Sequence, residues 1–112
     1  MKKIEAIIRP SKLHDVRKAL ANLSITGMTV LDALGLGTQE GYQEILRGKE
    51  INIDFLPKVK IEVVVADNIV DLCVDSIINA SRTGEIGDGK IFISPIDKIV
   101  RIRTGEVDVS AT

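Results

Sequence analysis

Three glycines near the C-terminal end of the chain are spaced as they are in phosphate-binding turns. The segment 83–90 reads Thr-Gly-Glu-Ile-Gly-Asp-Gly-Lys and lies between a predicted helix and a predicted strand. Glycine accepts positive φ angles and lets a ligand approach the backbone closely. Successive N–H groups in such a turn form an anion-binding nest, to which Lys90 adds a positive charge. The segment is not a P-loop, because Ile91 replaces Ser or Thr and a strand follows in place of a helix. An ordinary tight turn explains the glycines equally well.

Two arginines favour the phosphate interpretation. Arg101 and Arg103 are two residues apart in a predicted strand, so we expect both guanidinium groups to point the same way. Two neighbouring cations repel each other unless an anion joins them, and arginine suits phosphate oxygens well. Solvated charges paired with Glu or Asp are the alternative. Together with the glycine segment, the pair favours a phosphate site.

No arrangement of side chains predicts catalysis. His14, the only histidine, lies on a predicted amphipathic helix, where a solvated side chain is the simpler interpretation. Cys73, the only cysteine, falls on the apolar face of the second predicted helix and is expected in the core. Asp88 is a candidate metal ligand, or a base for slow ATP hydrolysis, but no set of nucleophile, base and orienting group accompanies it. A protein that binds phosphate without catalysis is therefore favoured, and a small phosphoryl-transfer enzyme and a structural assembly with an inert cleft are the alternatives.

The composition excludes several classes of protein. The chain has 112 residues, with 15 Lys and Arg against 16 Asp and Glu, so it lacks the basic excess of a nucleic-acid binder. One cysteine excludes an intramolecular disulfide. No apolar run is long enough to span a membrane, and the N-terminus does not resemble a signal peptide, so we expect a cytoplasmic protein without direct membrane insertion. A mean hydropathy of +0.18 is high for a small monomer.

The apolar pattern predicts one domain over 1–112, made of two β-α-β halves. Alternation predicts strands, and spacings of three and four predict helices. Ser11 and Asn68 are the expected N-caps and Gly84 the expected helix stop. A long polar stretch, 38–55, separates the halves, and 107–112 is a short tail. This order predicts a ferredoxin-like α+β sandwich with an extra C-terminal strand. The expected strands are 3–9, 29–34, 59–65, 90–96 and 99–103, and the expected helices are 12–23 and 68–82.

The expected fold leaves one face of the sheet without helices. Ile7 and Val64 point away from the main apolar rows of their strands, so we expect this face to be apolar as well. An apolar second face suggests that another chain covers it, and the high hydropathy has the same explanation. The sequence therefore predicts a homo-oligomer.

Several segments resemble one protein family. Residues 83–93 look like the second signature of the PII nitrogen-regulatory signal proteins, and the similarity extends over about residues 1–106. The resemblance implies a homotrimer of ferredoxin-like subunits whose sheets pack around a central axis. It also implies that ATP and ADP compete for the three clefts between subunits. The other similar segments are 2–10, 27–30, 54–62 and 101–106.

The resemblance also implies roles for individual residues. The nucleotide would be bound by Thr29, Gly35, Gly37, Thr38, Val64, Gly87, Asp88, Gly89, Lys90, Arg101 and Arg103. The effector 2-oxoglutarate would be bound by Gln39, Lys58, Gly37 and Gly41. Gln39 would also bind Mg²⁺, shared between ATP and 2-oxoglutarate, and an amide oxygen suits that ion.

The polar stretch, about 37–55, would be the T-loop of the family, whose conformation reports the bound ligand. Different loop shapes would then select partners, which requires differential affinity for those shapes. Arg47 matches the arginine that enters the transporter pore in the ammonium-transporter-regulating branch, and Tyr42 is a second candidate contact. A nitrogen-metabolism enzyme is the alternative partner. A transporter partner would bring the protein to the membrane.

Departures from the family pattern limit these expectations. Ile51 and Lys49 replace the tyrosine and serine that are modified in some members, so we predict no covalent switching at either position. Thr38 replaces a common phosphate-binding arginine, which leaves the preference for ATP or ADP open. A nucleotide sensor that has lost its response to 2-oxoglutarate is therefore a further alternative.

Overall fold

The computed structural model describes residues 1–38 and 53–108, which form strands, two α-helices and two short 3₁₀ turns. The 3₁₀ turns span Pro10–Lys12 and Asp67–Ile69. The helices are α1, Leu13–Asn22, and α3, Val70–Ser81. The strands are β1, Lys2–Ile8, β2, Thr29–Thr38, β3, Ile53–Val65, and β4, Lys90–Pro95.

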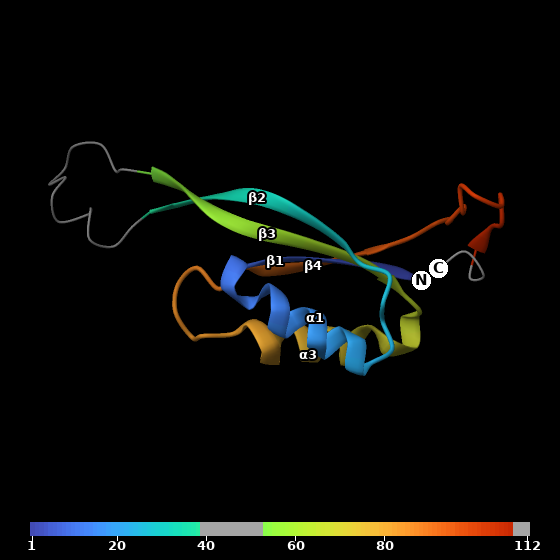
Figure 1. Ribbon diagram of the computed structural model, residues 1–112, viewed down its shortest axis with the longest axis horizontal. Helices are drawn as coiled ribbons and strands as arrows, with labels where there is room; N and C mark the ends of the chain where they lie inside the picture. The colour runs from blue at the N-terminus through green and yellow to red at the C-terminus, as the bar shows by residue number, and fades with distance from the viewer. Residues whose placement is uncertain (39–52, 109–112) are drawn as a thin grey trace, which may run out of the picture.

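The four strands form one sheet in the order β2-β3-β1-β4, and every neighbouring pair is antiparallel. Both α-helices cover the same face of this sheet (Figure 1). The predicted ferredoxin-like α+β fold is therefore confirmed. No α-helix among residues 1–38 and 53–108 is long and apolar enough to span a membrane.

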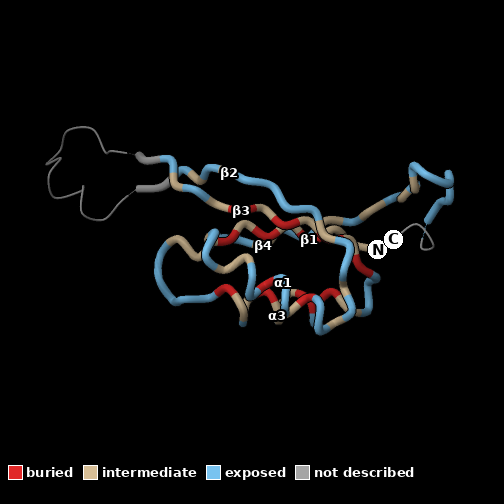
Figure 2. Tube along the Cα trace, in the orientation of Figure 1, coloured by how far each residue is buried: buried red, intermediate tan, exposed pale blue. Residues whose placement is uncertain are grey.

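The core lies between the helices and the two central strands (Figure 2). Alternate residues of β1 and β3 point toward the helices and are buried, because successive side chains of a strand face opposite sides. Cys73 is fully buried on α3, as predicted, and His14 is exposed on α1. The core is made of Ile4, Ala6, Ile8, Val16, Leu20, Val59, Ile61, Val63, Val65, Val70, Cys73 and Ile77.

The predicted helix ends were wrong. Ser11 and Asn68 lie inside the 3₁₀ turns, and neither α-helix has a side-chain cap at its N-terminus. The turns take over this role, because each closes a backbone hydrogen bond just before the helix starts. Helix α3 ends at Ser81, and Arg82 is already extended, so Gly84 belongs to the following loop.

Two strands are longer than predicted. Gly35 and Gly37 continue β2, and Pro57 lies inside β3 opposite Leu34. A proline is tolerated there because β1 ends at Ile8, opposite Val59, so β3 has only one neighbour at residue 57. The hairpin of β2 and β3 thus extends beyond the helices (Figure 1). Gly37, Thr38 and 53–55 are in strands, and the rest of the predicted loop, 39–52, lies outside the described residues.

The predicted fifth strand, 99–103, is absent from the described part of the chain. Val100 forms a single bridge with Val107, and residues 102–104 form a turn. This C-terminal arm, residues 96–108, leaves the end of the sheet beyond β4 (Figure 1), and no strand among residues 1–38 and 53–95 lies beside it. A strand needs a neighbour for its backbone groups, so the β-branched pattern alone does not produce one here.

The face without helices is only partly apolar. Ile7 and Val64 are half-buried there, as expected, but four charged side chains share the centre of the face. The ammonium of Lys3 lies 3.1 Å from Glu5 and 3.6 Å from Glu62, and that of Lys60 lies 3.4 Å from Glu5. A hydrogen bond from Lys3 lowers the pKa of Glu5. The high mean hydropathy therefore does not come from a purely apolar sheet face.

Replacing Ile77 by alanine should lower the free energy of unfolding by about 2–5 kcal/mol, because it leaves a cavity in the core. Leu72 on the same helix is 54% exposed, so Leu72→Ala should change it by only about 0.5 kcal/mol. Urea denaturation of both variants measures the difference. Equal losses would contradict the assigned core.

Candidate functional site

The loop that joins α3 to β4 folds around the carboxylate of Asp88. The backbone N–H groups of Thr83 and Gly84 donate to Oδ2 of Asp88 at 2.9 and 2.8 Å, and the Thr83 hydroxyl donates to Oδ1 at 2.5 Å. These donors, that hydroxyl foremost, hold the pKa of Asp88 far below its ordinary value. The carboxylate is therefore ionised and already satisfied by its own loop. A carboxylate with so low a pKa is a poor general base at neutral pH.

Arg9 attaches this loop to the end of β1. Its Nε donates to Oδ1 of Asp88 at 3.1 Å, and its Nη2 donates to the carbonyl oxygen of Ile86 at 3.0 Å. Pro10 restricts Arg9 to extended backbone, and its φ and ψ are −66° and 140°. Sequence reasoning missed Arg9. The signal was the register: Ile7 lies opposite Lys90, so two residues further along Arg9 comes opposite Asp88.

Lys58 approaches the loop from β3. Its Nζ donates to the carbonyl oxygen of Gly87 at 2.5 Å. The stem of Lys58 passes over Gly35 of β2, where a Cβ would lie 3.0 Å from Lys58 Cγ. A side chain at residue 35 would therefore push against Lys58. The structure thus brings Gly35 and Lys58 together with the glycine loop.

Two glycines of the loop are required by its geometry. Gly87 and Gly89 have φ angles of +103° and +102°, which other residues rarely adopt. At Gly89 a Cβ would also collide with the carbonyl oxygen of Ile7, because the chain passes directly over the end of β1. At Gly87 a Cβ would lie 3.3 Å from the guanidinium of Arg9. The glycines therefore bring the loop close to β1 as well as allowing its turns.

A second group of predicted residues lies at the other end of the sheet. Thr29 and Val64 line a shallow hollow of about 350 Å³ together with Ile99. Arg101 and Arg103 lie further out, on the C-terminal arm (Figure 1). The expectation that they share one face of a strand was wrong, because Arg103 is part of the turn 102–104 and Arg101 precedes that turn outside any strand. Arg101 is paired with Glu106 at 3.4 Å, which agrees with the alternative of solvated, paired charges.

One chain therefore carries the predicted nucleotide residues, and Lys58 of the predicted 2-oxoglutarate residues, in two separate groups. The loop group contains Gly35, Lys58 and residues 87–90, and the arm group contains Thr29, Val64, Arg101 and Arg103, at the opposite end of the sheet (Figure 1). Gly37 and Thr38 end β2 on the side of the loop group. The remaining predicted contacts, Gln39, Gly41, Tyr42 and Arg47, lie outside the described residues.

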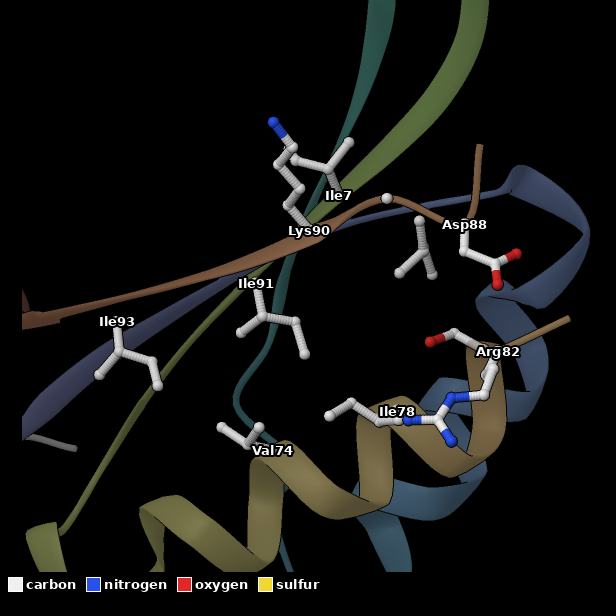
Figure 3. A pocket seen from close by; sticks show the side chains of 11 residues that line it. Ile7, Val74, Ile78, Arg82, Asp88, Lys90, Ile91 and Ile93 are labelled. Carbon is white, nitrogen blue, oxygen red and sulfur yellow. The ribbon is translucent and has the colours of Figure 1, made fainter. Parts of the chain in front are cut away.

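A cavity of about 430 Å³ lies behind the loop, between α3 and β4. Val74, Ile78, Ile91 and Ile93 line it, whereas Lys90 points to the opposite side of β4 (Figure 3). This cavity is mainly apolar and does not match phosphate chemistry. Lys90, the cation predicted to bind phosphate, therefore points away from this cavity, to the other side of β4.

Comparison with known proteins identifies the family. The model of the family "Nitrogen regulatory protein P-II" matches residues 1–106. The chain belongs to the P-II family. P-II proteins are nitrogen-regulatory signal proteins and generally not enzymes. The described strands and helices are those of this family's fold, as a solved P-II structure shows.

The relatives are similar over almost their whole length. The chain is 60% identical over 111 residues to P-II from Klebsiella oxytoca and to P-II 1 from Escherichia coli K12, covering 99% of each chain. It is also similar to the structure of Arabidopsis thaliana PII bound to citrate, with 40% identity and a TM-score of 0.79. That match covers 99% of this chain and 91% of the Arabidopsis chain.

Gly89→Ala and Gly84→Ala form a matched pair, since both positions have positive φ but only Gly89 faces the backbone of β1. Gly84→Ala should lower the free energy of unfolding by about 1–2 kcal/mol through backbone strain. Gly89→Ala should lower it by about 3 kcal/mol or more, because the loop must also move away from Ile7. Urea denaturation checks the order, and equal losses would contradict the close approach at Gly89.

Proposed function

We propose that the protein is a non-enzymatic sensor of nitrogen and energy status that binds ATP or ADP in the clefts between subunits of a homotrimer. The observation that carries this proposal is the separation of the loop group from the arm group within one chain. Residues at opposite ends of one sheet cannot contact the same nucleotide. A site that uses both groups must therefore take each group from a different subunit.

The chemistry of the two groups is complementary. In the loop group, backbone N–H groups of residues 87–90 and the ammonium of Lys90 would bind the phosphates. In the arm group, Arg101 and Arg103 of a neighbouring subunit would reach the same phosphates, while Thr29 and Val64 line the cleft. Arg101 would exchange its exposed pairing with Glu106 for phosphate, to which arginine can donate two parallel hydrogen bonds.

The position of Lys58 supports an effector site beside the phosphates. An ammonium has three donors, and one of them is used by Gly87, so two can bind a carboxylate of 2-oxoglutarate. Gly37, Gln39 and Gly41 would complete this site, with Mg²⁺ held by Gln39 between ATP and 2-oxoglutarate. The Arabidopsis relative is bound to citrate, another small polycarboxylate, which supports an effector of this class.

The output of the sensor would be the conformation of residues 37–55. ATP together with 2-oxoglutarate would favour one set of conformations, and ADP would favour another. A partner would bind only some of these conformations. Arg47 and Tyr42 are the proposed contacts with that partner, which would be an ammonium transporter or an enzyme of nitrogen metabolism. A slow ATP-hydrolysing enzyme has less support, because Asp88 is held as a low-pKa carboxylate by its own loop.

Calorimetry with ATP and ADP tests the nucleotide site. Lys90→Ala and Arg103→Ala should each weaken ATP binding by about tenfold or more, because each removes a cation from the phosphates. Arg17→Ala, which removes an exposed arginine of α1, is the control and should bind as the wild type does. If the wild type gives no heat with either nucleotide, the proposed function is wrong.

The same titrations extend to 2-oxoglutarate. Binding should require Mg²⁺ and ATP, and Lys58→Ala should abolish it, whereas Lys18→Ala on the exposed face of α1 should not. Equal binding of 2-oxoglutarate without nucleotide would contradict the shared site. No binding under any condition would favour the sensor that has lost its 2-oxoglutarate response.

A further inference from the structure

Arg9 belongs to neither the loop group nor the arm group, yet it makes two of the contacts that join the glycine loop to the sheet. We propose that Arg9 is a positioning residue for nucleotide binding: it holds residues 86–88 so that the backbone N–H groups of Gly87 and Asp88 face the phosphates before a ligand arrives. This inference rests on the proposed nucleotide function and concerns how the loop acquires its shape.

The two hydrogen bonds of Arg9 lie on either side of Gly87. Nη2 binds the carbonyl oxygen of Ile86, and Nε binds the side chain of Asp88. The guanidinium itself lies against Gly87, where even a Cβ would come within 3.3 Å of it. One planar group thus fixes three consecutive residues at the centre of the loop.

These contacts determine where two amides point. In a trans peptide the C=O and the following N–H point in opposite directions. The carbonyl of Ile86 is held by Arg9, so the N–H of Gly87 must point away from the guanidinium. The carbonyl of Gly87 is held by Lys58, so the N–H of Asp88 must point away from that ammonium. Two cations therefore turn two successive N–H groups outward, as an anion nest requires.

Asp88 connects Arg9 to the first residues of the loop through hydrogen bonds. Its Oδ1 accepts from Arg9 and from the Thr83 hydroxyl, and its Oδ2 accepts from the N–H groups of Thr83 and Gly84. Arg9 and Asp88 thus connect the end of β1 to the residues that follow α3. The side chains of this pair are only 30% and 25% exposed, so the contact is partly shielded from solvent.

The geometry requires arginine in particular. Its guanidinium offers several donors in a rigid plane, and here two of them reach acceptors two residues apart. A lysine ammonium at the end of a flexible chain can neutralise Asp88 but cannot fix the Ile86 carbonyl in the same orientation. A loop that is already ordered loses less conformational entropy when it binds a ligand. Arg9 should therefore raise nucleotide affinity without touching the nucleotide.

A double-mutant cycle tests whether Arg9 acts through Asp88. Arg9→Met and Asp88→Asn should each weaken ATP and ADP binding by about tenfold, the value of one charged hydrogen bond. If Arg9 and Asp88 act through their mutual contact, the double variant should bind each nucleotide about as weakly as either single variant does. Arg9→Lys should recover part of the loss. Arg17→Met, on exposed α1, is the matched control and should not change either affinity.

Amide hydrogen exchange of the ligand-free protein gives the second readout. Residues 83–89 should exchange faster in Arg9→Met than in the wild type or in Arg17→Met, while the central strands stay protected. If Arg9→Met does not fold, Arg9→Lys and Asp88→Asn provide the same comparison, with smaller increases in exchange.

Two results would overturn the role of Arg9 and leave the proposed function standing. Additive losses of affinity with unchanged exchange would mean that Arg9 contacts the nucleotide itself. Wild-type affinity in Arg9→Met would mean that the loop needs no support from β1, although nucleotide binding would stand. If the wild type bound neither nucleotide, the proposed function would fail together with this role of Arg9.

Discussion

The length of the four-stranded sheet keeps the loop group and the arm group of predicted ligand-binding residues apart. The glycine loop precedes β4 and the C-terminal arm follows it, so they lie at opposite ends of this strand. β1 pairs with β4 along its length. Each group alone offers only part of what a nucleotide needs. Under the proposed function, one chain would therefore provide both halves of a site without assembling it, as expected of a subunit that binds ligands at its borders with other subunits.

Local order in the loop comes from polar groups that are satisfied within the loop and by two cations of the neighbouring strands. Asp88 is surrounded by donors, and Arg9 and Lys58 hold two successive carbonyl groups. Because these polar groups are satisfied, the neighbouring N–H groups can face outward without distorting the loop. Gly87 and Gly89 make the close packing on β1 possible. The glycines that first suggested a phosphate site thus have a structural role in packing the loop on β1, and this role is compatible with phosphate binding.

Sequence reasoning succeeded where the signal is local or periodic. The alternation in 59–65 predicted the buried row of β3, and the helical spacing placed Cys73 in the core. Sequence reasoning failed where the structure of a segment depends on the strand beside it. Residues 99–103 have the β-branched pattern of a strand but no partner strand in the described part of the chain. Pro57 continues β3 because the sheet is only two strands wide there. The pairing of Arg9 with Asp88 spans 79 positions and follows from the β1–β4 register, which composition and spacing do not reveal.

The central claim is that each nucleotide site takes its loop group and its arm group from different subunits. Mixed assembly of Lys90→Ala chains with Arg103→Ala chains tests it most directly. Each variant alone should bind ATP weakly. After the two are unfolded and refolded together in equal amounts, roughly one cleft in four should combine an intact loop with an intact arm and bind ATP with wild-type affinity. Mixtures that bind no better than the separate variants would contradict the claim.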